Sequence, residues 1–132
     1  MNDKEALLAY RITQAQETLV EARKMLQNNF SPRSIVNRTY YAMFYLLLAL
    51  FLKTDINIKT SKHTAVISIF DRELVHKGIV GEEYSKSLHK IFEARLQSDY
   101  KEFVELTHAD ADNYIKLAEE FFEEIKKLIV NL

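Results

Sequence analysis

The chain has no cysteine, one proline (Pro32) and only two glycines (Gly78 and Gly81) among its 132 residues. The absence of cysteine excludes disulfides, thiolate metal ligands and a cysteine nucleophile. An all-β fold needs turn residues every 8–12 positions or so, and this chain offers very few of them. The composition therefore favours an all-α fold.

The sequence also lacks the usual marks of a membrane or secreted protein. Its first ten residues, MNDKEALLAY, are charged and do not have the basic-then-apolar form of a signal peptide. The longest uncharged apolar run, Tyr40–Leu52, is shorter than the roughly 20 residues that span a bilayer. We expect a cytoplasmic protein with no membrane partner.

The net charge of −1 argues against a broad nucleic-acid-binding surface, but the charges are unevenly distributed. Residues 31–101 hold eleven Lys/Arg and seven Asp/Glu, which gives +4. Residues 102–132 hold three Lys/Arg and eight Asp/Glu, which gives −5. The middle of the chain therefore suits a phosphate-bearing partner, and the last helix suits water or a basic surface. Solvated helix faces also produce such imbalances by chance.

Apolar residues recur at helical spacing along almost the whole chain. They predict five helices, at about residues 3–28, 32–53, 61–78, 82–98 and 107–131, with Ser31 and Pro32 opening the second and Thr60 or Ser61 capping the third. The segment 98–106 is ambiguous. Short connections between long helices predict an up-and-down bundle of four long helices plus a shorter third helix, in a single domain over residues 1–132.

The second predicted helix is apolar almost all round, yet its first half carries Asn37, Arg38, Tyr40, Tyr41 and Tyr45. Polar groups on a central helix are costly unless each one finds a partner. The sequence therefore indicates either a carefully satisfied core or a functional site. For the tyrosines alone, hydroxyls that reach a neighbour are a sufficient explanation.

Further polar residues extend the candidate site beyond this helix. Lys62 and His63 open the third helix, where free N–H groups favour anions. Arg95 continues an apolar stripe, with Asp99 one turn later, so the two could simply form a salt bridge. We expect Arg38, Arg95, Asp99 and Tyr100 to come together and to bind a phosphate or a base edge, because arginine suits both.

Several chemistries lack support in the sequence. The two Glu-x-x-His pairs, Glu73/His76 and Glu105/His108, fall near predicted helix ends, and the second helix has no carboxylate to complete a di-iron site. There is also no HExxH motif, phosphate-binding glycine loop or Gly-x-Ser-x-Gly elbow. We expect no metal and no cofactor.

Taken together, these residues resemble the HEPN domain family (higher eukaryotes and prokaryotes nucleotide-binding) over roughly residues 5–130. The resemblance implies a bundle of about five helices that commonly forms homodimers. It also implies a nucleotide or RNA ligand and a minimal nucleotidyltransferase as partner, in a toxin–antitoxin-type module. The features that carry it are NRTYYAMF at residues 37–44, Ser61-Lys62-His63, Arg95-x-x-x-Asp99-Tyr100 and a long final helix.

Many members of this family are metal-independent ribonucleases that use an Arg-x(4–6)-His motif at the dimer interface. After Arg95 this chain has Tyr100, Lys101 and Glu102 where that histidine would stand, and Arg72-x-x-x-His76 is one residue too short. No catalytic residue is therefore assigned, and Arg95 and Tyr100 stay weak candidates. The ligand-binding candidates are Asn37, Arg38, Tyr41, Lys62, His63, Arg95, Asp99 and Tyr100.

Three hypotheses follow from the sequence. The first is a non-catalytic or weakly catalytic HEPN protein that binds a nucleotide, RNA or a nucleotidyltransferase. The second is a ribonuclease in which Tyr100 or His63 replaces the missing histidine, although an unperturbed tyrosine, with a pKa of about 10, is poorly suited to this role near neutral pH. The third is a purely structural interaction module.

Overall fold

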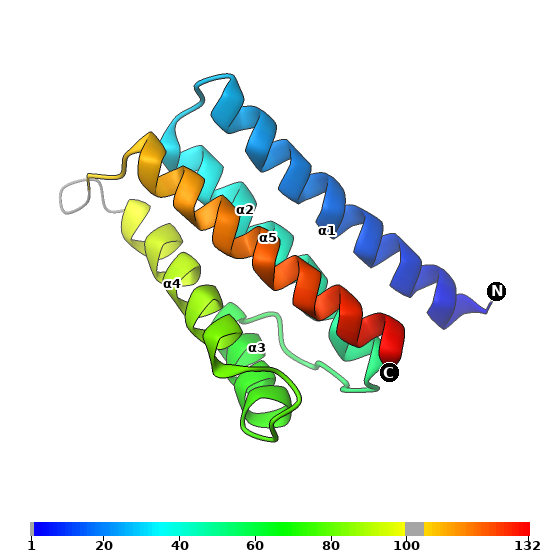
Figure 1. Cartoon of the computed structure of the whole chain (residues 1–132). Helices are drawn as coiled ribbons and strands as arrows, with labels where there is room; N and C mark the ends of the chain where they lie inside the picture. Colours follow the sequence, from blue (N-terminus) through cyan, green and yellow to red (C-terminus); the bar gives the residue numbers. More distant parts are fainter. Residues whose placement is uncertain (1, 100–104) are drawn as a thin grey trace.

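A computed structural model describes residues 2–99 and 105–132, and within these ranges the chain is helical with no β-strand. The long helices alternate in direction along the bundle (Figure 1). The elements are α1 (Asp3–Gln27), α2 (Pro32–Lys53), α3 (His63–Phe70), the π-helical turn η1 (Asp71–Val75), α4 (Glu82–Ser98) and α5 (His108–Asn131). The predicted all-α bundle of four long helices and a shorter third one is confirmed.

Helix α2 is the centre of the bundle and packs against α1, α4 and α5 (Figure 1). Twelve of its 22 residues are buried, because apolar side chains occupy nearly every side of the helix. By length and composition alone, the whole of α2 could cross a membrane. This was not predicted from the sequence, because only the shorter uncharged run 40–52 was considered there. However, 67% of its most apolar window is buried inside the bundle, as in the core helix of a soluble protein.

Three helical segments end in the same backbone motif, with a residue of positive φ just after the helix. Asn29 (φ 61°), Asp55 (φ 58°) and Gly78 (φ 77°) are these residues. After α1, the Phe30 N–H donates to the Met25 carbonyl at 2.9 Å, and after α2 the Ile56 N–H donates to the Phe51 carbonyl at 2.9 Å. The predicted termination at Gly78 is confirmed, and Asn29 and Asp55 adopt the conformation that asparagine and aspartate tolerate best after glycine.

The cap predicted for the second helix is confirmed, the cap predicted for the third is wrong, and α5 has a cap that was not predicted from the sequence. Ser31 Oγ accepts the Ser34 N–H at 3.2 Å, with Pro32 in the first turn of α2. Thr107 and Asp110 form a reciprocal capping box at the start of α5. The predicted cap of α3 by Thr60 or Ser61 is wrong, because Lys62 is the N-cap residue and makes no side-chain cap bond. Thr60 Oγ1 instead accepts the Lys62 N–H at 3.1 Å and closes a local turn.

The predicted third helix is not a single α-helix. It changes at Phe70 into the π-helical turn η1, in which the His76 N–H donates to the Asp71 carbonyl at 2.8 Å. The Asp71 carboxylate fixes this turn to α4, since it accepts a bond from Ser85 Oγ at 2.6 Å and lies 2.6 Å from His89 Nε2. Sequence periodicity cannot distinguish this wider turn from an α-helical one.

Candidate arginine–tyrosine–histidine site

Helices α2 and α4 bring Arg95 between two adjacent tyrosine rings. The Arg95 Cζ atom lies 5.2 Å from the centre of the Tyr40 ring and 5.1 Å from the centre of the Tyr41 ring. Arg95 Nη2 also donates to the Tyr41 hydroxyl at 3.2 Å. A cation over an aromatic face is stabilised by the quadrupole of the ring. The predicted polar residues on α2 and the predicted Arg95 therefore do meet.

The Arg95 guanidinium is only partly satisfied within the described residues. Its Nε atom is buried and has no hydrogen-bond partner there. No ion pair joins it to a described carboxylate, and Asp99, one turn later on α4, instead lies 3.3 Å from Arg33 Nη2. The predicted alternative of an Arg95–Asp99 salt bridge therefore does not form. A half-buried cation without a carboxylate partner is suited to receive an anion.

His63, the first residue of α3, completes this cluster. Its Nδ1 atom lies 2.7 Å from the hydroxyl of Tyr40, which is wholly buried. Its ring stacks on Phe44 at 4.1 Å between ring centres. Burial raises the pKa of Tyr40, an effect that the charge of Arg95 partly opposes, so the hydroxyl keeps its proton. A buried hydroxyl needs an acceptor, and we therefore assign Nδ1 as that acceptor and Nε2 as the protonated nitrogen.

The environment of His63 favours its neutral form. Burial lowers the pKa of His63, and the nearby charge of Arg95 lowers it further. At neutral pH the ring is therefore uncharged, and the tautomer set by Tyr40 makes Nε2 a hydrogen-bond donor. Arg95 and His63 thus both present donors, whereas Tyr40 and Tyr41 supply aromatic faces.

The other predicted residues form a separate group, one helical turn away. A polar pocket of about 450 Å³ is lined by Arg33, Asn37, Arg38, Asp99 and neighbouring residues near the start of α2. Arg38 Nη2 lies 2.7 Å from the Glu21 carboxylate of α1, and its Nε atom is buried without a partner among the described residues. Asn37 precedes Tyr41 by four residues and Asp99 follows Arg95 by four, an offset of about 6 Å along each helix.

The structure thus divides the predicted site in two. Tyr41, His63 and Arg95 belong to the aromatic cluster, while Asn37, Arg38 and Asp99 line the polar pocket. The expected grouping of Arg38, Arg95 and Asp99 is therefore formed only in part: Arg38 and Asp99 line one pocket, where they pair with Glu21 and Arg33, and Arg95 lies with the tyrosines. Lys62 is exposed beside His63. Tyr100 lies outside the described residues.

Sequence reasoning missed three residues of these two groups. Tyr40 and Phe44 were quoted in the motif but not chosen as site residues, although their i,i+4 spacing places both on the face that meets His63. Arg33 gave no signal, because a charged residue in the first turn of a helix is ordinary. No cluster of three or more potential metal ligands occurs in the part of the chain that is described.

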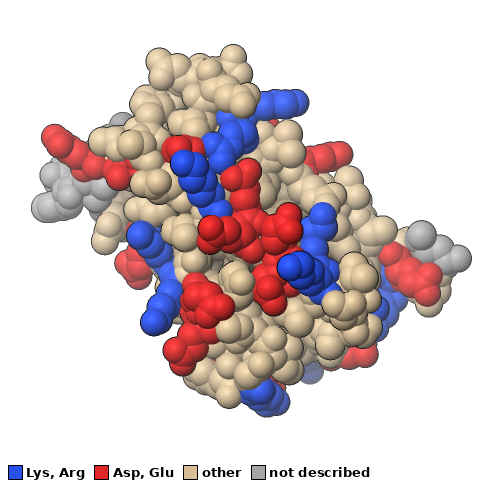
Figure 2. Space-filling view, in the orientation of Figure 1, with Lys and Arg blue, Asp and Glu red and all other residues tan. Residues whose placement is uncertain are grey.

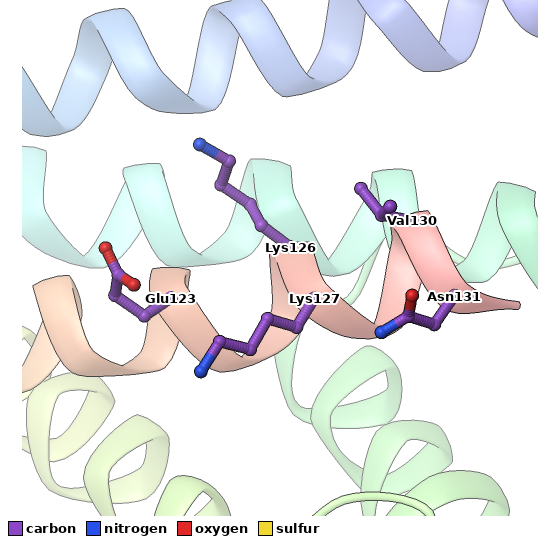
Figure 3. Close-up of a pocket in the computed structure, with 5 residues that line it drawn as sticks. All are labelled: Glu123, Lys126, Lys127, Val130 and Asn131. Carbon is purple, nitrogen blue, oxygen red and sulfur yellow. The ribbon is translucent and has the colours of Figure 1, made fainter.

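A hollow of a different kind, of about 390 Å³, is lined by Glu123, Lys126, Lys127, Val130 and Asn131, and Figure 3 shows how these five side chains lie on α5. All five residues come from α5, and Val130 is 80% exposed, so this is the outer surface of one helix. Acidic side chains gather near the centre of the face over which α5 runs, with basic side chains around them (Figure 2). None of the predicted site residues that the structure describes lines this hollow.

The chain is thus an all-α bundle in which an arginine of α4, two tyrosines of α2 and a histidine of α3 come together. The family model of the HEPN domain matches residues 8–128. The chain belongs to the HEPN domain family.

Proteins with similar sequences support this assignment. A Thermotoga maritima protein named "UPF0332 protein" is 39% identical over all of this chain and 98% of its own length. A Methanocaldococcus jannaschii protein named as a "Putative toxin" is 34% identical over 87% of this chain and 83% of that protein. A second protein of that name and organism is 26% identical over 92% of this chain and 81% of its own length.

Proposed function

We propose that this protein is the toxin-type member of a toxin–antitoxin module, and that it binds a nucleotide or RNA where α2 meets α4. The observation that carries the proposal is the state of Arg95, a half-buried arginine held by Tyr40 and Tyr41 without a carboxylate partner among the described residues. Membership of the HEPN family and the two toxin-named relatives support it. The protein is expected in the cytoplasm, where such ligands occur.

The aromatic cluster and the polar pocket suit different parts of a nucleotide. Phosphate oxygens accept hydrogen bonds from Arg95 and from the protonated Nε2 of His63. A base can stack on an aromatic face such as that of Tyr41, which is only partly buried. The polar pocket, one turn away, adds Asn37 and Arg38, whose amide and guanidinium suit a second phosphate or a base edge.

The same geometry supports a binding role over a catalytic one. A general base must offer an unprotonated nitrogen to the 2′-hydroxyl of RNA. Nδ1 of His63 is already occupied by the Tyr40 hydroxyl at 2.7 Å, and the remaining ring nitrogen carries the proton. His63 therefore donates to a ligand and does not accept a proton from it. We propose that the protein holds its ligand without cleaving it.

Ligand binding can be tested with a short labelled single-stranded RNA and, separately, with ATP. Arg95→Met is expected to weaken binding about tenfold or more, because a charge-assisted hydrogen bond is lost. Arg72→Met is the matched control, since Arg72 carries the same charge on a side chain that is 68% exposed. Circular dichroism checks that each variant is folded. Equal affinities of the two variants, or no binding by wild type, would refute the proposal.

A ribonuclease is the second candidate, and the observation that favours it is that His63 and Arg95 both contact Tyr40. Its test is incubation of RNA with EDTA from about pH 5 to about pH 9. We expect no cleavage. Cleavage that disappears in both Arg95→Met and His63→Gln would establish the ribonuclease instead.

We also propose a homodimer and a minimal nucleotidyltransferase partner, both from the family resemblance. Tagged protein should co-purify with a nucleotidyltransferase encoded by a neighbouring gene, and light scattering should give twice the chain mass. Failure to co-purify would remove this partner without affecting the RNA-binding test.

A further inference from the structure

A third cavity lies under the extended segment that joins α2 to α3. It measures about 320 Å³, within the range of about 300–1,000 Å³ that is typical of small-molecule sites. Arg11 of α1, Leu48 and Phe51 of α2, and Ile56, Ile58 and Thr60 of the segment line it. None of these residues belongs to the arginine–tyrosine–histidine cluster or to the polar pocket.

The backbone at the end of α2 creates this cavity. The positive φ of Asp55 turns the chain back across the helix end, where the Ile56 N–H reaches the Phe51 carbonyl. From here to residue 60 the side chains alternate, exposed at odd positions and half-buried at even ones, as in an extended strand. Ile56 and Ile58 thus face inward but remain only partly buried. The segment therefore covers the end of α2 and leaves a cavity beneath it.

Arg11 gives this cavity a specific chemistry. It is the only charged residue among those that line the cavity in the described structure. Its Nη1 atom donates to the Leu48 carbonyl at 3.4 Å, which is long for a hydrogen bond. No described carboxylate forms an ion pair with it. The partly buried Arg11 guanidinium, with one long hydrogen bond and no ion pair to a described carboxylate, has donors left that suit an anion.

We propose that this cavity binds a small ligand with an apolar body and a single anionic head, either a carboxylate or a phosphate. The head contacts Arg11, and the apolar body packs against Leu48, Ile56 and Ile58. This site is independent of the proposed nucleotide or RNA site, because Arg95, His63 and Asn37 take no part in it. Either site can therefore fail its test without affecting the other.

Titration calorimetry with octanoate, octyl phosphate and octanol tests the proposal. The two anions are expected to bind one-to-one and at least tenfold more tightly than octanol, because only they compensate Arg11. The tighter of the two identifies the preferred head group. NMR shifts of Leu48, Ile56 and Ile58 methyl groups on octanoate addition should locate the ligand in the cavity.

Variants separate the cavity from general charge effects. Arg11→Met should remove the tenfold preference for the anions, whereas Arg72→Met, at an exposed site of equal charge, should keep it. Leu48→Trp, which fills the cavity, should abolish binding of all three probes. If Arg11→Met does not fold, two other variants take its place. Arg11→Lys should keep the preference for the anions, and Leu48→Trp should abolish binding of all three probes. No anion binding, equal effects of the two Met variants, or methyl shifts elsewhere would overturn the proposal.

Discussion

The hydrogen bond between Tyr40 and His63 offers a direct measure of how the site is built. Tyr40→Phe removes one buried hydroxyl and leaves the ring in place against Phe44 and Phe92. The loss is the 2.7 Å bond to Nδ1 of His63. Because His63 is half-buried, water can replace only part of that bond. We expect the free energy of unfolding to fall by about 1 kcal/mol, the usual net contribution of one hydrogen bond.

This change translates into a measurable shift of the melting temperature. An unfolding entropy of about 2.1 cal/mol/K per residue gives about 0.28 kcal/mol/K for 132 residues. A loss of about 1 kcal/mol therefore lowers Tm by about 3–4 °C. Thermal unfolding followed by circular dichroism measures this shift. Tyr10→Phe is the matched control, since Tyr10 is 62% exposed, and it should leave Tm unchanged within about 1 °C.

The outcome also bears on the protonation of His63. Nitrogen-15 spectra of wild type should show a neutral ring with its proton on Nε2, and this signature should weaken in Tyr40→Phe. A Tyr40→Phe protein as stable as Tyr10→Phe, with an unchanged His63 spectrum, would refute the reasoning. The tautomer assigned to His63, and with it the preference for binding over catalysis, would then lose its support.

Three further predictions concern stability. Thr107→Ala should lower the free energy of unfolding by about 1 kcal/mol, because it removes the capping box of α5. Thr13→Ala, at an exposed position of α1, should change it little, and urea unfolding measures both. Asn29→Gly should stabilise the protein by about 0.5 kcal/mol because its φ of 61° favours glycine, and a lower urea midpoint would contradict this. Folding lowers the pKa of His63 below its usual value of about 6.5. Just below about pH 6.5 the unfolded chain therefore binds a proton at His63 more readily than the folded protein does, and the free energy of unfolding should fall as the pH drops. His63→Gln should reduce this fall between about pH 7 and about pH 5, and an identical pH profile of the two proteins would count against it.

The helices could be predicted from the sequence because local signals specify them. Apolar residues at helical spacing, the Ser31-Pro32 start and the glycine at position 78 are all properties of short segments, and each appears in the structure as expected. The π-helical turn at Asp71–Val75 could not be predicted, because one additional residue in a turn leaves the apolar pattern almost unchanged.

The site could be predicted only in part, because a long side chain can contact groups on several neighbouring helices. Spacing correctly suggested that Arg95 faces the polar half of α2, where it meets Tyr41. It could not specify which of several carboxylates a long arginine side chain would contact, and Arg38 extends to Glu21 of α1. The Arg11 cavity depends on how a non-helical segment crosses the end of α2, which helical periodicity does not describe.

The π-helical turn has a consequence for how the chain tolerates changes in length. A turn closed by the bond from His76 to Asp71 contains one residue more than an α-helical turn. Deletion of the exposed Arg72 would therefore convert η1 to an α-helical turn and leave Leu74 and Val75 facing the core. The same deletion in the middle of α4 would rotate all later residues by about 100° and displace Arg95 from Tyr40 and Tyr41. Among residues 2–99 and 105–132, η1 is thus the π-helical turn at which a helix can lose a residue and keep its register, whereas α4 cannot.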